Sequence, residues 1–127
     1  MNYEKIDLEK IDEYIIESEL IEHQLKIGNI LKKKNVPIDR SSSIQGYQIV
    51  NYEVGRVIKY FKHSVSSTCS KYKESYVKKK CKQAMALNAI EQIKKLSNEC
   101  EKCKYHKKRC LRKIQTVLKY FYSQIEQ

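Results

Sequence analysis

The residues best suited to chemistry are five cysteines, all in the second half of the chain: Cys69, Cys81, Cys100, Cys103 and Cys110. A free cysteine behaves as a small hydrophobic residue and is often buried. Cys100, Cys103 and Cys110 also recur at the three- and four-residue spacing of one helix face. One interpretation is therefore that these thiols pack against a neighbouring helix.

A metal site is a second interpretation, because Cys100, Cys103, His106 and Cys110 are all potential ligands. Their spacing departs from the C-x2-C-x4-H-x4-C pattern of zinc knuckles, and the glycines of such a knuckle are missing. On a continuous helix, Cys100 and Cys110 lie about 15 Å apart along the axis. Zinc holds sulfur at about 2.3 Å. The sequence therefore predicts no metal site and no cofactor.

Disulfide bonds are a third interpretation. In an antiparallel helical hairpin, facing residues have a nearly constant sum of residue numbers, and this pairs Cys69 with Cys110 and Cys81 with Cys100. The segment from Cys69 to Cys110 resembles the mitochondrial twin C-x9-C (CHCH) family. Cys100-x9-Cys110 matches that family's spacing, whereas Cys69-x11-Cys81 departs from it. The resemblance implies two nested disulfides, import into the intermembrane space and a structural or assembly role.

Histidines are few, and one of them suggests an alternative activity. Arg56-x6-His63 falls within the permissive Arg-x(4–6)-His pattern of HEPN-type helical ribonucleases, although Val57 stands where a polar residue is usual. This resemblance implies a helical ribonuclease as one alternative function. Glycine-rich phosphate loops and paired catalytic carboxylates are absent. We therefore expect a non-enzymatic protein without a small-molecule substrate.

Charge is unevenly distributed along the chain, whose net charge is +11. Residues 1–31 hold eight acidic residues and three lysines, a net of −5, whereas residues 40–127 hold twenty basic and six acidic residues, a net of +14. Such asymmetry is typical of a surface that attracts an anionic macromolecule, such as RNA or an acidic protein. A well-solvated helix surface is the simpler interpretation.

The basic residues concentrate in two clusters that we interpret as an anion-binding surface. The first consists of Lys71, Lys73, Lys78, Lys79, Lys80 and Lys82, and the second includes Lys104, Lys107, Lys108, Arg109 and Arg112. In the hairpin described above, the two clusters would merge into one patch able to bind phosphates without reading sequence. Tyr72, Tyr76 and Tyr105 are interleaved and suit either stacking on bases or half-buried packing.

The elements that position these residues are all predicted to be helices. Three glycines and one proline leave little material for tight turns,. We expect an all-α antiparallel bundle of three long helices, or four with a break near Ser64–Ser70, forming one domain over residues 1–127. An acidic helix is predicted over 1–34 from about Tyr3, a linker over 35–41, and a basic helical hairpin over 42–127.

Apolar spacing gives more detail within these helices. The first helix has a wide apolar face, typical of packing against two neighbours, at Leu8, Ile11, Ile15, Ile16, Leu20, Ile27 and Ile30,. Ser42–Gln45 is a capping box, and the next helix has one apolar face at Tyr47, Val50, Val54, Val57, Phe61 and Val65,. Gly55 in that helix costs about 1 kcal/mol relative to alanine, which close packing of another helix would explain.

The remaining chain lacks glycine and proline from Arg56 onward, so turns must come from weaker signals. We predict the principal turn near Asn88, because asparagine caps helices and Glu91 follows three residues later. The last helix is then predicted to be one helix with a coiled-coil-like seam, interrupted only at Lys107. The seam consists of Ile93, Leu96, Cys100, Cys103, Lys107, Cys110, Ile114, Val117 and Phe121,.

Localisation and function follow as expectations. No segment approaches the ~18 apolar residues of a membrane span, and the start lacks the features of a signal or transit peptide. We expect an intracellular, soluble subunit of a larger assembly, located in the mitochondrial intermembrane space if disulfides form. Its basic hairpin is expected to dock on an anionic partner, RNA or a ribonucleoprotein first. The sequence leaves open whether the acidic helix docks on that hairpin.

Overall fold

The computed structural model describes residues 6–33, 42–102 and 106–126, and in these ranges it contains helices and no strand. The elements are α1 (Leu8–Lys33), α2 (Ser42–Ser67), a short 3-10 turn η1 (Cys69–Lys71), α3 (Ser75–Lys102) and α4 (Lys107–Glu126). The predicted all-α bundle is confirmed, in its four-helix form.

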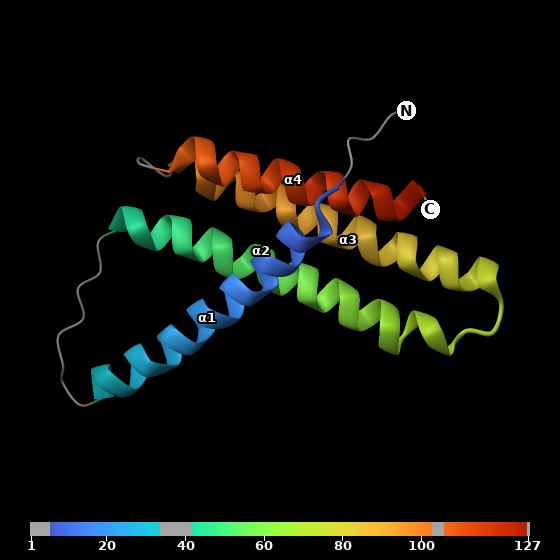
Figure 1. The fold of residues 1–127 in the computed structure, drawn as a ribbon, viewed down its shortest axis with the longest axis horizontal. Coiled ribbons are helices and arrows are strands. Elements are labelled where there is room, and N and C mark those ends of the chain that lie inside the picture. Colours follow the sequence, from blue (N-terminus) through green and yellow to red (C-terminus); the bar gives the residue numbers. More distant parts are fainter. Residues whose placement is uncertain (1–5, 34–41, 103–105, 127) are drawn as a thin grey trace.

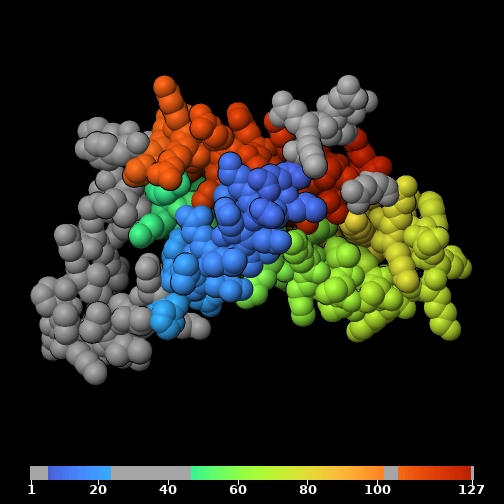
Figure 2. All heavy atoms as spheres, viewed as in Figure 1, coloured from blue at the N-terminus to red at the C-terminus, as the bar shows by residue number. Residues whose placement is uncertain are grey.

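α3 runs antiparallel to both α2 and α4, which run in the same direction, and α1 crosses this layer (Figure 1). α3 packs against both α2 and α4, so it is the central element of this three-helix layer. α1 packs mainly against α2 and crosses it obliquely near the middle of both helices. In the space-filling view α1 covers the middle of the face formed by α2 and α4 (Figure 2).

The core is a single cluster of buried apolar side chains contributed by all four helices. Its fully buried members include Ile11, Val50, Val54, Ile58, Ile93, Val117 and Phe121. The predicted apolar face of α2 is confirmed, since each of its six residues is buried or packs against this cluster. Phe61 makes edge-on ring contacts with both Tyr120 and Phe121, with centroids 6.2 and 5.1 Å apart.

The break after α2 is confirmed and has a local cause. α2 ends at Ser67. The hydroxyl groups of Ser66 and Ser67 both donate to the backbone oxygen of His63, at 3.0 and 2.8 Å. Such side-chain bonds compete with the helical ladder, and serine favours helix ends for this reason. η1 and three further residues then turn the chain back into α3.

The predicted turn near Asn88 is wrong, because Asn88 lies inside α3. The segment around it is rich in alanine, and Ala86, Ala89, Ile90 and Ile93 form a buried stripe that rewards a continuous helix,. The chain instead reverses between Lys102 and Lys107. The predicted continuous last helix is therefore also wrong.

The first helix begins later than predicted and packs through a narrower face. Asp7 caps α1, because its carboxylate accepts a hydrogen bond from the backbone N–H of Lys10 at 3.2 Å,. Of the predicted face, Ile11 is buried and Ile15 packs against the core, whereas Leu8, Ile16 and Leu20 are more than half exposed. Tyr14, which was not predicted, is also buried. Helix α1 therefore contacts α2 closely, and only one edge of the apolar face of α1 takes part in this contact.

Gly55 explains this close contact. A Cβ atom at Gly55 would lie 2.1 Å from the Cβ of Ser18 and 2.5 Å from the backbone oxygen of Tyr14. The Ser18 hydroxyl also donates to the backbone oxygen of Tyr52 at 2.6 Å. The prediction that a second helix packs closely on Gly55 is confirmed.

Several predictions fall outside the described residues. These are the linker over 35–41, the first residues of the acidic helix up to residue 5, and Cys103, Lys104 and Tyr105. The side chains of the capping box and of Ile27 and Ile30 are also not described. Among the helices that the structure does describe, none combines the length and apolar character needed to cross a bilayer.

Burial of Tyr120 makes stability sensitive to alkaline pH. Burial, with a smaller contribution from Asp12, raises the pKa of Tyr120 from 10.0 to about 12. The folded state therefore keeps this proton at a pH where the unfolded state loses it, so stability falls from about pH 10 to pH 12. Two pKa units correspond to about 2–3 kcal/mol. Urea unfolding at pH 9 and pH 12 should show a smaller loss in Tyr120→Phe than in the original protein. An equal loss in both proteins would contradict this assignment.

Candidate functional site

The two predicted basic clusters lie at opposite ends of the bundle, so the merged patch is wrong. The first cluster lies in η1 and at the start of α3, and the second at the start of α4 (Figures 1 and 2). Along α3, Lys80 and Lys102 are separated by about 33 Å. The clusters separate because the chain reverses after Lys102 and not near Asn88.

We call the first cluster the elbow surface, after its place where α2 bends back into α3. It consists of six lysines and two tyrosines: Lys71, Tyr72, Lys73, Tyr76, Lys78, Lys79, Lys80 and Lys82. All are exposed except Lys82, which is half-buried. Between Thr68 and Gln83 the only acidic residue is Glu74, so this segment has a net charge of six minus one, +5.

The elbow surface combines these lysines with the positive end of a helix. α3 begins at Ser75 and has no acidic residue in its first turn. Helix N-termini carry a partial positive charge and are normally followed by acidic side chains. Lys78, Lys79 and Lys80 place positive charge near this positive helix end. Such a repulsion destabilises the start of α3 by about a few tenths of a kcal/mol. A bound anion would remove this cost, so the local electrostatics favour an anionic ligand.

Two exposed aromatic rings lie among the lysines. Tyr72 is 45% and Tyr76 67% exposed, so neither is spent on packing the core. The Lys80 ammonium group lies 5.6 Å from the centre of the Tyr76 ring. The predicted interleaving of aromatic and basic side chains is therefore present on one surface, and the alternative of half-buried packing does not apply to these two residues.

The second cluster, at the start of α4, is more internally compensated. Lys107 forms an ion pair with Glu101 at 2.9 Å. The Arg109 guanidinium lies 5.8 Å from the centre of the Tyr47 ring, which also stacks on His106 at 4.7 Å. Lys108 and Arg112 are exposed. Of the described cations at this end, Lys107 is therefore held in an ion pair and Arg109 against a ring.

The four cysteines that the structure describes form two disulfides, but not the two that were predicted. Cys69 pairs with Cys81 and Cys100 with Cys110, each with a Cα–Cα distance of 5.5 Å. The nested pairs Cys69/Cys110 and Cys81/Cys100 are wrong, because they assumed a single hairpin turning near residue 90. Each disulfide instead closes one of two successive turns. The interpretation of Cys100 and Cys110 as packed residues is also right in part, since both are fully buried.

The acidic first helix docks on the basic part of the chain, which the sequence left open. Asp12 pairs with Lys62 at 2.6 Å and Glu19 with Lys59 at 3.1 Å. Exposed pairs of this kind contribute about 0–1 kcal/mol each. They use basic residues of α2, whereas no ion pair from a described residue of α1 reaches Lys71, Lys73, Lys78, Lys79 or Lys80. The elbow surface therefore stays available to another anion.

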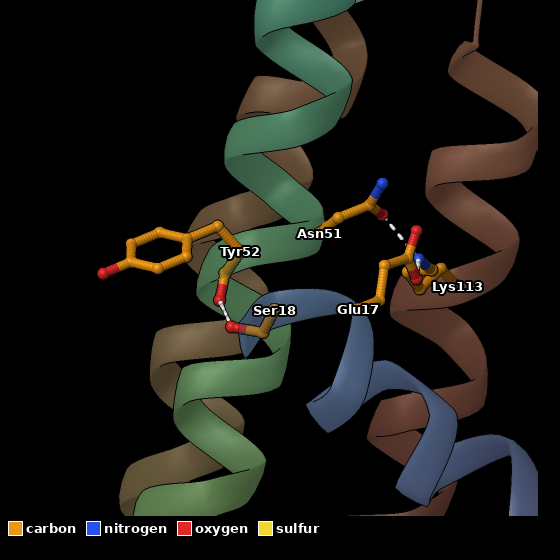
Figure 3. Close-up of polar contacts among 5 residues, drawn as sticks. All are labelled: Glu17, Ser18, Asn51, Tyr52 and Lys113. Atoms are coloured by element: carbon orange, nitrogen blue, oxygen red, sulfur yellow. Dashed lines mark hydrogen bonds and ion pairs between the residues drawn. The ribbon is translucent and has the colours of Figure 1, made fainter. Parts of the chain in front are cut away.

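A buried polar cluster under α1 was missed from the sequence. The Lys113 ammonium group donates to the carboxylate of Glu17 at 2.8 Å and to the side-chain oxygen of Asn51 (Figure 3). It also lies 4.6 Å from the centre of the Tyr14 ring. Three helices meet in this cluster. The sequence does contain a signal for this cluster. Lys113 is three residues after Cys110 and four before Val117, which places it on the buried stripe of α4.

The other chemical motifs are not assembled into a site by the described residues. Arg56 and His63 are exposed and two turns apart on α2, and Arg56 pairs with Glu53 at 3.6 Å and lies over the Tyr52 ring. The ribonuclease alternative stays a prediction. Within residues 6–33, 42–102 and 106–126, no group of three or more histidine, cysteine or acidic side chains is arranged to hold a metal ion.

No protein-family model, curated protein or solved structure matches this chain. The class of protein is therefore defined by the fold alone, an all-α helical bundle. The CHCH resemblance stays a prediction.

Proposed function

We propose that this protein is a non-enzymatic interaction subunit whose elbow surface binds the phosphate backbone of RNA within an RNA–protein assembly. The observation that carries the proposal is the set of exposed lysines at the positive end of α3, with one acidic neighbour. Lysine contacts to phosphates give affinity without reading sequence. The basic α2 residues neutralised by α1 take no part in it.

RNA is favoured over an acidic protein by the two exposed tyrosines. Single-stranded nucleic acids combine a phosphate backbone with bases that stack on aromatic rings, and each stack contributes about 1–3 kcal/mol. Tyr72 and Tyr76 offer such rings beside the lysines. An acidic protein surface would use the charges and leave these rings exposed.

Neutralising the elbow surface should weaken RNA binding and its salt dependence together. We expect Lys78→Gln/Lys79→Gln/Lys80→Gln to reduce the affinity for single-stranded RNA at low salt by tenfold or more. Each lost phosphate contact lowers the slope of log K against log salt by about 0.7, so three lower it by about 2. Filter binding between 50 and 200 mM salt measures both quantities.

A matched variant separates the elbow surface from general charge. The variant Lys107→Gln/Lys108→Gln/Arg109→Gln removes an equal number of positive charges, three, from the other end of the bundle. We expect it to change the affinity less than threefold. Equal losses in both variants would show that net charge alone attracts RNA, and salt-independent or absent binding would end the proposal. Circular dichroism verifies that both variants fold.

A disulfide-stapled mitochondrial assembly subunit, similar to CHCH proteins, is the second candidate. Two disulfides on a helical scaffold favour it, because disulfides persist in oxidising compartments. Alkylation of the native protein without reductant, followed by intact mass measurement, tests it directly. One alkylated cysteine out of five supports this candidate, and five alkylated cysteines in protein taken from its own cells remove it.

A further inference from the structure

An open pocket of about 420 Å³ lies at the elbow, between the end of α2, η1 and the start of α3. Its volume is within the ~300–1,000 Å³ of typical small-ligand sites, toward the lower limit. Its lining is mostly apolar and includes Val65 and Cys69. The Cys69–Cys81 disulfide ties the wall formed by η1 to α3. The pocket is therefore part of a cross-linked segment of the fold.

Cationic groups also line this apolar pocket. Lys78, Lys79 and Lys82 all contribute to its walls, the first two exposed and the third half-buried. No acidic side chain lines it. Lysine side chains around a mostly apolar lining suit a ligand that is apolar at one end and carries a phosphate at the other.

Two serines supply acceptors in the same pocket. The Ser66 hydroxyl donates its hydrogen to the backbone oxygen of His63, and the Ser70 hydroxyl donates to the backbone oxygen of Ser66. Because both hydroxyl hydrogens are already donated, the hydroxyl oxygens of Ser66 and Ser70 can act only as acceptors toward a ligand. Inorganic phosphate offers almost no hydrogen-bond donor to these acceptors, whereas the hydroxyl groups of a ribose can donate to them.

We propose that the pocket lined by Val65, Ser70 and Lys79 binds one nucleotide unit, with the phosphate at the lysines and the ribose hydroxyls at the serines. This inference rests on the proposed function, since it names the part of an RNA strand that the elbow surface holds. The base lies against the apolar part of the pocket lining. The ribose 2′-hydroxyl is the group that distinguishes RNA from DNA in such sites.

Titration with uridine 5′-monophosphate, its 2′-deoxy analogue and inorganic phosphate tests the pocket independently of strand binding. In two-dimensional NMR, we expect the uridine nucleotide to shift the amide signals of Val65, Cys69, Ser70 and Lys79. Its affinity should exceed that of inorganic phosphate at least fivefold and that of the deoxy analogue at least twofold. Equal affinity for the nucleotide and inorganic phosphate, or shifts located elsewhere, would overturn the proposal.

Filling the pocket without changing charge gives the decisive variants. Ser70→Tyr and Ser66→Leu each place a larger side chain in the pocket, and Ser75→Tyr is the matched control because Ser75 is exposed and does not line it. We expect tenfold or greater loss of nucleotide affinity in the first two and less than twofold change in the control. Nucleotide affinity within twofold of the original in both filled variants would overturn the pocket.

The two proposals fail in different ways. Strand binding that weakens but persists when the pocket is filled, while nucleotide binding is lost, supports both the phosphate contacts and the pocket. Unchanged strand binding in the filled variants overturns the pocket as part of the strand site. Nucleotide binding without strand binding supports the pocket and removes the RNA-binding function. Strand binding without any nucleotide binding overturns the pocket alone.

Discussion

Removing both disulfides, by changing Cys69, Cys81, Cys100 and Cys110 to alanine, is expected to lower the free energy of unfolding by about 5–6 kcal/mol. The disulfides close loops with sequence separations of 12 and 10 residues. In the chain-entropy description, each loop of this size contributes about 3 kcal/mol by restricting the unfolded chain. A domain of this size has about 5–15 kcal/mol in total. Urea unfolding followed by circular dichroism measures the loss.

Variants lacking one disulfide each provide the controls. The two cross-links lie at opposite ends of α3, so their effects should add within about 0.5 kcal/mol. Proteolysis without reductant should recover the pairs Cys69–Cys81 and Cys100–Cys110. Two results would contradict this arrangement of disulfides. One is recovery of the pair Cys69–Cys110, and the other is a free energy of unfolding of the quadruple alanine variant within about 1 kcal/mol of the original.

The positions of the disulfides relate stability to the candidate site. α4 begins with Lys107 and Lys108, and in α3 Lys78 follows the first three residues. Neither helix has an acidic residue in its first turn, against the preference of the helix dipole,. Each disulfide joins the early part of one of these helices to the preceding element. The cross-links therefore hold in place two helix ends that their own charges weaken. An exposed cationic helix end that is kept rigid in this way suits anion binding, because no ordering cost falls on the binding step.

The apolar periodicity of the chain was sufficient to predict the helices but not all of their ends. The stripe on α2 and the tolerance of Gly55 follow from spacing and side-chain size. Burial of the stripe in the core confirms the first, and the close approach of Ser18 confirms the second. The reversal after Lys102 has no glycine or proline to mark it. Asn88 offered a stronger local signal, but the buried stripe around Ala86 and Ala89 outweighs the capping preference of a single residue,.

The candidate site was predicted in its residues but not in its arrangement. The lysines of the elbow surface were identified by composition alone, and all but the half-buried Lys82 are exposed. Which lysines share a surface depends on the position of the turn, and an error of about 15 residues moved the second cluster to the other end of the bundle. The same error paired Cys69 and Cys81 with cysteines of the last helix, whereas they pair with each other. Cysteine pairing also follows from which segments face each other.

The polar cluster under α1 leads to the second large effect, a loss of about 2–3 kcal/mol in Lys113→Met. Lys113 has only 8% of its side chain exposed and is bonded to Asn51, which is itself 4% exposed. Methionine keeps the length of the side chain but removes the donor, which leaves the Asn51 oxygen buried without that bond. Glu17 is 41% exposed, so water compensates most of its loss,. Lys95→Met, at an exposed position of α3, is the matched control and should change stability by less than about 0.5 kcal/mol,.

A second substitution distinguishes a buried polar network from simple packing of the lysine stem. If the cost of Lys113→Met comes from the orphaned Asn51 oxygen, then Asn51→Leu in the same chain removes the orphan. The double variant should therefore be more stable than the single variant by about 1 kcal/mol, a coupling that unfolding of all four proteins in the cycle measures. Strictly additive losses would mean that Asn51 and Lys113 act independently. In that case α1 would be held on the bundle by the close contact at Gly55 and the buried side chains of Ile11 and Tyr14, without a contribution from the charge that crosses beneath it.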